Sequence, residues 1–144
     1  MKYLLDTSTI AVLLARYKEK ALDILKKCAT LDLAFYELGN IIWKEYALFK
    51  RITLEEALSR ASEAYTIIQT MKVYSITKPE EYREIMSTAV TLKITFYDSA
   101  FLTISKINNF KLVTQDRELL EKAPNTGIKV ISIGEFLSEI GGFP

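Results

Sequence analysis

The sequence predicts an α/β fold in which helices cover both faces of a central parallel sheet. Short apolar runs rich in Leu, Val and Ile alternate with segments of helical periodicity along the whole chain, which is the pattern of parallel strands buried on both faces. No linker, internal repeat or shift in composition divides the 144 residues, and this length is common for one domain. We therefore expect a single domain spanning residues 1–144.

The first third of the chain predicts two strands, each followed by a helix. Residues 2–5 form an apolar run that ends at Asp6, and the next segment, 7–17, has cap residues followed by apolar positions at helical spacing. Helical periodicity continues over 21–28. The apolar run at 31–35 predicts a second buried strand.

A pair of helices is expected next, inserted between the second and third strands. Apolar residues recur on one face over residues 36–50, which indicates an amphipathic helix. Thr53 then precedes another helical segment, and Glu56 three residues later completes a capping box. Residues 71–76 return as a strand.

The last part of the chain continues the alternation of helices and strands. Pro79 is placed as the first residue of a helix, and a break near Thr95 precedes a further helix that opens around Asp98. Residues 110–114 and 128–133 have the β-branched, apolar character of strands. A short helix is expected between them and another at the end of the chain.

The content of histidine and cysteine excludes several kinds of site. The chain has no histidine, so catalytic triads, Cys-His pairs and histidine-ligated zinc are impossible. Cys28 is the only cysteine, which rules out an intrachain disulfide, favours the cytoplasm and predicts a buried, unreactive thiol. No apolar run reaches membrane-spanning length, so we expect neither a signal peptide nor a membrane anchor.

Acidic residues follow several of the predicted strands. In open α/β sheets, ligands bind beyond the carboxyl ends of the strands. Asp6 ends the first strand, while Glu37 and Asp116 each follow a predicted strand by two residues, so these three are expected at one edge. Asp98 opens a helix, and periodicity alone does not place it there. The alternative is that these acids only cap helices or interact with helix dipoles.

Four segments resemble the motifs of a known family in order and approximate spacing. They are LLDTSTI at 4–10, YELGNIIWK at 36–44, YDSAFLTIS at 97–105 and LVTQDREL at 112–119. Together they resemble PIN domains, and among these the VapC-like toxin ribonucleases, over nearly the whole chain. The resemblance implies a three-layer α/β/α PIN-like fold with a central parallel sheet of about five strands. It also implies a metal-dependent endoribonuclease that partners a small VapB-like antitoxin and forms a homodimer.

Carried over by position, the resemblance makes Asp6, Glu37, Asp98 and Asp116 the catalytic, metal-binding acids. Asp6 and Asp98 are expected to be the principal ligands, and the other two are expected to complete the shell directly or through water. Mg²⁺ or Mn²⁺ suits such a set, because these ions prefer hard oxygen ligands. A bound ion would neutralise phosphate charge and activate water, so the absence of histidine is no obstacle.

Other residues near these motifs are candidates for supporting roles. The resemblance implies that the hydroxyls of Ser8 and Thr114 orient the carboxylates. Asn40, one helical turn beyond the second acid, is a candidate to hold a water or an RNA oxygen, and Lys44 and Arg117 are candidates to contact phosphate. The alternative for these three is a solvated surface position. The net charge is only +1, so any contact with nucleic acid must be local.

Several competing interpretations remain. A haloacid-dehalogenase-like phosphatase needs a second Asp where Ser8 stands, and a receiver domain needs an early acidic doublet, which this sequence lacks. A catalytically silent PIN-like domain that binds RNA or protein is the main alternative. Tyr36 and Tyr97 are among the aromatics able to stack bases, but no role is assigned to them. The helix pair over residues 36–71 offers apolar surface for a homodimer or an antitoxin helix, or else is core.

Overall fold

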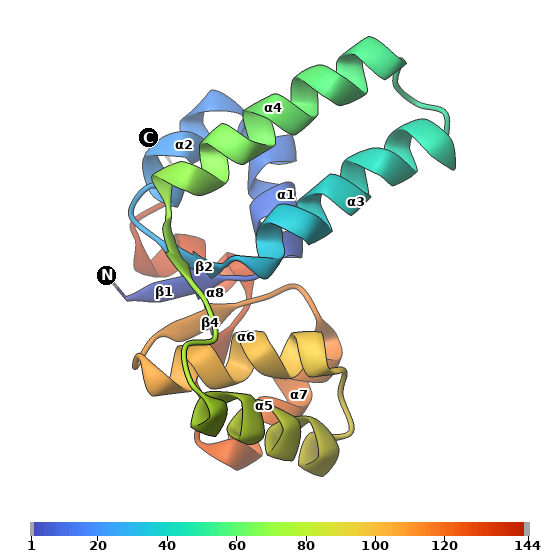
Figure 1. Cartoon of the computed structure of the whole chain (residues 1–144). Coiled ribbons are helices and arrows are strands. Elements are labelled where there is room, and N and C mark those ends of the chain that lie inside the picture. The colour runs from blue at the N-terminus through green and yellow to red at the C-terminus, as the bar shows by residue number, and fades with distance from the viewer. Residues whose placement is uncertain (1, 143–144) are drawn as a thin grey trace.

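Five short strands form one parallel sheet in the computed structural model, which describes residues 2–142 (Figure 1). The strands are β1 (Tyr3–Leu5), β2 (Ala29–Leu31), β3 (Lys72–Tyr74), β4 (Lys111–Val113) and β5 (Val130–Ile131). Every neighbouring pair is parallel, in the order β3-β2-β1-β4-β5. The predicted parallel sheet of about five strands is confirmed.

The strand order reverses between β1 and β4. From the central β1 the chain moves outward to β2 and β3, and it then returns to place β4 on the other side of β1. Such a reversal is a topological switch point, where the loops leaving two neighbouring strands diverge and leave a crevice beyond their carboxyl ends. The fold therefore places its most favourable ligand site just past Leu5 and Val113, the last residues of β1 and β4.

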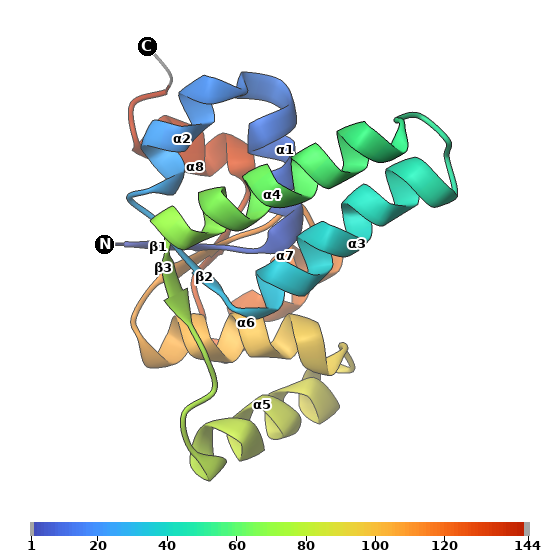
Figure 2. The same cartoon turned by 45° about the horizontal axis from the view of Figure 1, so that its top comes forward.

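Helices cover both faces of the sheet, as predicted (Figures 1 and 2). They are α1 (Thr7–Tyr17), α2 (Glu19–Leu25), α3 (Leu33–Ala47), α4 (Leu54–Thr70), α5 (Pro79–Leu92), α6 (Phe96–Ile107), α7 (Arg117–Lys122), a 3₁₀ turn (Ala123–Thr126) and α8 (Ile133–Glu139). Successive side chains along each strand point to opposite faces of the sheet, so the sheet separates two hydrophobic cores. Leu5 and Val113 pack with α1 to α4 and α8, while Leu4 and Leu112 pack with α5 to α7.

The helix pair α3 and α4 projects beyond the rest of the molecule in both views (Figures 1 and 2). The predicted capping box opens α4: Thr53 Oγ1 accepts a hydrogen bond from the Glu56 N–H at 3.1 Å, and Glu56 Oε1 accepts one from the Thr53 N–H at 3.0 Å. Of the residues in α4, only Ile68 is buried. Much of the apolar surface of this pair is therefore open to solvent.

The second strand is the main error in the predicted elements. It was expected at 31–35 but spans Ala29–Leu31, and α3 begins at Leu33 rather than at 36 and ends at Ala47 rather than at 50. The Asp32 N–H bonds to the Tyr74 carbonyl at 2.9 Å, and the Phe35 N–H already bonds helically to the Asp32 carbonyl at 3.1 Å. A short apolar run has no periodicity that separates a strand from a buried helical turn.

The start of α6 also differs from the prediction. Thr95, not Asp98, is the cap: its hydroxyl accepts a hydrogen bond from the Asp98 N–H at 3.1 Å, so Asp98 is the third residue of the helix. The predicted break is present, since Lys93 ends α5 in the left-handed conformation with φ 57°. Near the C-terminus, β5 covers only two residues of the predicted 128–133.

Cys28 is buried as predicted, and burial raises the pKa of its thiol to about 12, so it carries no thiolate at neutral pH. Among the residues that the structure describes, no helix has both the length and the apolar character needed to cross a membrane.

Candidate active site at the carboxyl edge of the sheet

Asp6 lies at the switch point, directly after β1, and its carboxylate is held by three donors. Oδ1 accepts hydrogen bonds from the Thr9 N–H at 2.9 Å and from the Ser8 hydroxyl at 3.1 Å, and Oδ2 accepts one from the Thr114 hydroxyl. The first of these bonds caps α1. Asp6 is only 8% exposed, so its orientation is fixed by local structure and by a contact from β4. Ser8 and Thr114 both reach the acid that they were expected to orient.

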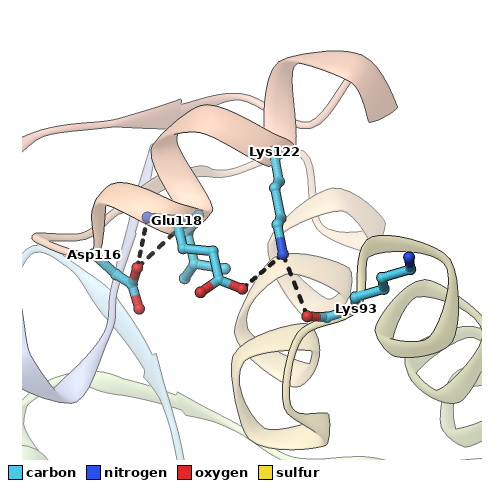
Figure 3. Close-up of polar contacts among 5 residues, drawn as sticks. Lys93, Asp116, Glu118 and Lys122 are labelled. Atoms are coloured by element: carbon cyan, nitrogen blue, oxygen red, sulfur yellow. Dashed lines mark hydrogen bonds and ion pairs between the residues drawn. The ribbon is translucent and has the colours of Figure 1, made fainter.

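Thr114 connects two of the predicted acids across the switch point. It is fully buried at the end of β4, where its hydroxyl donates to Asp6 and accepts from the Asp116 N–H at 3.0 Å. Asp116 caps α7, because its Oδ1 accepts from the N–H groups of Glu118 at 2.8 Å and Leu119 at 3.4 Å (Figure 3). One hydroxyl thus fixes the start of α7 relative to the end of β1.

A second set of contacts ties α7 to the turn between α5 and α6. Figure 3 shows Lys122 reaching from α7 to the main-chain carbonyl of Lys93, at 3.3 Å, while it pairs with Glu118 at 2.7 Å. An exposed ion pair of this kind contributes little to stability. The contacts show that the helix that begins at Asp116 lies beside the turn that leads to Asp98.

Glu37 lies in the second turn of α3, six residues beyond the end of β2 rather than two. Its Oε1 accepts a hydrogen bond from the Thr7 hydroxyl at 2.7 Å. Burial raises the pKa of Glu37, the Thr7 hydrogen bond opposes this rise, and the charges of Asp98 and Asp6 add to it. Sequence reasoning missed Thr7, although it is the residue between the acid and the serine of the DTS motif.

Asp98 joins the other acids at this edge, which periodicity had left undecided. Burial raises its pKa most, followed by the charge of Asp116, while a hydrogen bond with Thr95 lowers it and the charges of Asp6 and Glu118 raise it further. Glu118, one residue past Arg117 in α7, is therefore an additional acid beside the site that sequence reasoning did not single out.

The four predicted acids thus come from four different elements and face one another without a basic partner. None of them takes part in a salt bridge within residues 2–142. In that same part of the chain, no three acidic or cysteine side chains are close enough together to hold a metal ion by themselves. The structure therefore presents a loose ring of carboxylates rather than a closed coordination cage.

The donor chemistry of this ring still fits a hard divalent cation. Its groups are carboxylate and hydroxyl oxygens, and Mg²⁺ is commonly bound through one or two carboxylates while it keeps several waters. Asp98 and Glu37 are the carboxylates whose pKa the neighbouring acids raise. Because a cation would relieve this repulsion, these residues are suited to hold one partly through water.

The remaining candidates lie on exposed surface. Asn40 and Lys44 follow Glu37 along α3, and Arg117 is the first residue of α7. None of the three forms a hydrogen bond or an ion pair with the acids in the described part of the chain. The structure does not bring them into the carboxylate ring.

The raised pKa values of Glu37 and Asp98 predict a pH-dependent cost of ionisation. A carboxyl whose pKa is higher in the folded than in the unfolded state stabilises the fold most below its ordinary pKa, and this contribution is lost as the pH rises through the raised value. Burial is the main cause of both shifts and the charges of neighbouring acids add to it, so ionising either group costs stability.

Glu37→Gln is therefore expected to raise the free energy of unfolding at neutral pH in metal-free buffer, because the amide does not ionise. The amide oxygen keeps the acceptor for Thr7, and the gain should vanish below about pH 4, where the wild-type group is neutral too. Urea denaturation of the wild type and the variant, from neutral pH to below about pH 4, measures the gain in stability and its loss at low pH. A gain that persists unchanged at low pH would show that the ionisation of Glu37 is not its cause.

Comparison with known proteins identifies relatives of this chain. No family model matches it. Exonuclease VapC9 of Pyrobaculum aerophilum is 31% identical over 122 residues, which cover 85% of this chain and 86% of that protein. Ribonuclease VapC3 of the same organism is 32% identical over 133 residues, which cover 86% of this chain and 96% of that protein.

Solved structures agree with these relatives. The crystal structure of PAE2754 from Pyrobaculum aerophilum has a TM-score of 0.77 at 31% identity, with 96% of both chains covered. DNA-bound VapBC from Salmonella typhimurium has a TM-score of 0.64 at 18% identity, with 92% of this chain and 98% of that chain covered, and shares the fold. The resemblance that the sequence motifs indicated is confirmed. The chain belongs to the VapC family of PIN-domain proteins.

Proposed function

We propose that this protein is a metal-dependent endoribonuclease, the toxin of a toxin–antitoxin pair, that hydrolyses RNA phosphodiester bonds at the ring formed by Asp6, Glu37, Asp98 and Asp116. The observation that carries the proposal is the convergence of these acids at the switch point, with no salt bridge to any of them within residues 2–142. Burial, with the neighbouring charges adding to it, raises the pKa of Glu37 and Asp98. Relatives named as a ribonuclease and an exonuclease support the same chemistry. We treat residues 1–144 as one domain, because every described strand pairs in one sheet.

Mg²⁺ or Mn²⁺ held by these carboxylates would supply charge neutralisation at the phosphate and an activated water. The protein's own side chains orient the carboxylates and accept the proton of the attacking water. Asp6 is held in one orientation by its three donors. Thr7 binds Oε1 of Glu37, so Oε2 remains to accept a proton from the attacking water.

Contacts to the rest of the RNA are proposed for three exposed residues. Arg117 stands beside Asp116 at the start of α7, within reach of a phosphate that approaches the ring. Asn40 is one turn beyond Glu37 on α3, where its amide can bind a water or a ribose oxygen, and Lys44 is one turn further. Their positive or polar ends offset the acidic character of the ring at its rim.

Asp98→Asn tests the proposed function. Thr95 caps the helix through the Asp98 N–H, which asparagine keeps, and the amide oxygen can replace the carboxylate beside the Thr95 hydroxyl, so the variant should fold. We expect Mn²⁺-dependent cleavage of a linear and a circular RNA of mixed sequence to fall at least about a hundredfold, while Glu63→Gln on exposed α4 retains it. Undiminished cleavage by the Asn variant would contradict the site, and cleavage of the linear RNA alone would identify an exonuclease.

A VapB-like antitoxin and a second copy of the chain are the proposed protein partners. The exposed apolar side chains of α3, α4 and the turn between them support this: Trp43, Tyr46, Leu48, Phe49, Leu54, Leu58 and Tyr65. A patch of this kind is typical of surfaces that bind an amphipathic helix or another subunit. Sedimentation of the isolated protein measures whether it is a dimer before any antitoxin is added.

A further inference from the structure

Near the start of both α3 and α6, a tyrosine directly precedes one of the acids of the carboxylate ring. Tyr36 precedes Glu37 in α3, and Tyr97 precedes Asp98 in α6. Neighbouring residues in a helix point about 100° apart. The two acids interact with each other, and the two tyrosines line one groove next to them.

This groove has a volume of about 180 Å³ and lies between the first turns of α3 and α6 and the segment after β3. Its walls include Ile76 and Phe96 as well as the two tyrosines. The volume is below the range of roughly 300–1,000 Å³ that holds drug-sized ligands, so it suits one planar ring.

The tyrosines do not serve the protein core. Tyr36 is 78% exposed and Tyr97 59% exposed, and Ile76 beside them is 41% exposed. Neither tyrosine hydroxyl forms a hydrogen bond with another residue in the described part of the chain. Both rings are thus open aromatic surfaces carried on ordered helix starts.

A polar pair lies in the same groove. The Ser75 hydroxyl donates to Asp32 Oδ2 at 2.9 Å, which leaves Oδ1 to accept from a ligand. A carboxylate accepts hydrogen bonds from N–H groups, and every nucleobase carries one on an edge that is exposed in a single strand. A neutral ring also suits this acidic edge better than an anion does.

We propose that this groove binds one unstacked nucleobase of single-stranded RNA next to the phosphate that is cleaved. The base stacks on Tyr36 and Tyr97, and Asp32 accepts a hydrogen bond from its edge. This inference rests on the proposed function and adds its substrate class, RNA with a splayed base at the cut. Proteins that bind single strands use such aromatic platforms.

The test measures RNA binding and cleavage separately. Binding of a short fluorescent single-stranded RNA of mixed sequence is measured in the Asp98→Asn background, to which Tyr36→Ala or Tyr97→Ala is added. Each alanine is expected to weaken binding about 5-fold to 100-fold, and phenylalanine at the same position is expected to restore it. Leu22→Ala, at an exposed apolar position of α2 that does not line the groove, is the control and should bind normally.

In the otherwise wild-type protein, Asp32→Asn is expected to change which base stands next to the cut, because an amide can donate as well as accept. Sequencing of the cleaved ends of a randomised RNA pool reads this out. Unchanged binding by both alanine variants, with cleavage intact, would overturn the subsite and leave the nuclease standing. If RNA binding depends on the two tyrosines but the protein with all its acids does not cleave RNA, the subsite is supported and the proposed activity is contradicted. If the alanine variants bind RNA as tightly as the protein with both tyrosines but sediment differently from it, the groove binds a protein partner instead.

Discussion

Asp6→Asn is expected to lower the rate of RNA cleavage by about a thousandfold or more while it leaves the fold intact. The loss corresponds to about 4 kcal/mol of transition-state stabilisation, which is the scale of removing one central charged group from a preorganised site. The fold should survive because asparagine caps helices as well as aspartate does. Its Oδ1 can still accept from the Thr9 N–H and the Ser8 hydroxyl.

Asp6→Ala separates the two roles of this residue. It removes the cap of α1 as well as the charge, so we expect the same loss of cleavage together with about 1–2 kcal/mol lower stability. Single-turnover cleavage in Mn²⁺ and thermal unfolding of both variants give the two quantities. If the asparagine variant cleaves RNA at the wild-type rate, the charge of Asp6 has no part in the reaction.

The positions of Asp6 and Asp116 could be predicted from sequence because both depend on local signals. Each follows a continuous apolar run, and each is a helix cap, so the strand end and the helix start lie within a few residues. The parallel pairing of those two strands then brings the two acids to the same edge without further information.

Glu37 was placed correctly at the edge for a partly wrong reason. The apolar run after Leu31 is the first turn of α3 and not a strand, and its residues have no period that distinguishes the two. Glu37 reaches the site because α3 packs against α1, where it accepts a hydrogen bond from Thr7, thirty residues earlier in the chain. A contact of that separation leaves no trace in local periodicity.

For Asp98, the start of its helix could be predicted from the sequence, but its position relative to the other acids could not. Its helix start was readable, since Thr95 with an acid three residues later is a capping pattern. Its distance from the other acids depends on how α6 packs against α5 and β4. Only the family resemblance, not the pattern of residues, indicated that it joins the ring.

Thr114→Val is expected to damage stability and activity together, more than the loss of one hydroxyl usually does. Valine keeps the shape of the side chain, but at this fully buried position it leaves Asp6 Oδ2 and the Asp116 N–H without their shared partner. The unsatisfied carboxylate of buried Asp6 costs about 1–3 kcal/mol, whereas exposed Asp116 can bond to water, so we expect the free energy of unfolding to fall by about 1–3 kcal/mol. Cleavage should fall about tenfold to a hundredfold, because Asp6 and the start of α7 lose their alignment.

Two matched variants make this result specific. Thr114→Ser keeps the hydroxyl and should retain most of the cleavage rate. Thr30→Val removes an equally buried hydroxyl, which donates to the Leu5 carbonyl at 2.8 Å and does not touch the acids, so it should cost stability without lowering the cleavage rate of the folded protein. Urea denaturation and single-turnover kinetics under conditions where all variants are folded provide the comparison. If Thr30→Val slows cleavage as much as Thr114→Val does, the effect is general loosening of the sheet and the link between Asp6 and Asp116 has no catalytic part.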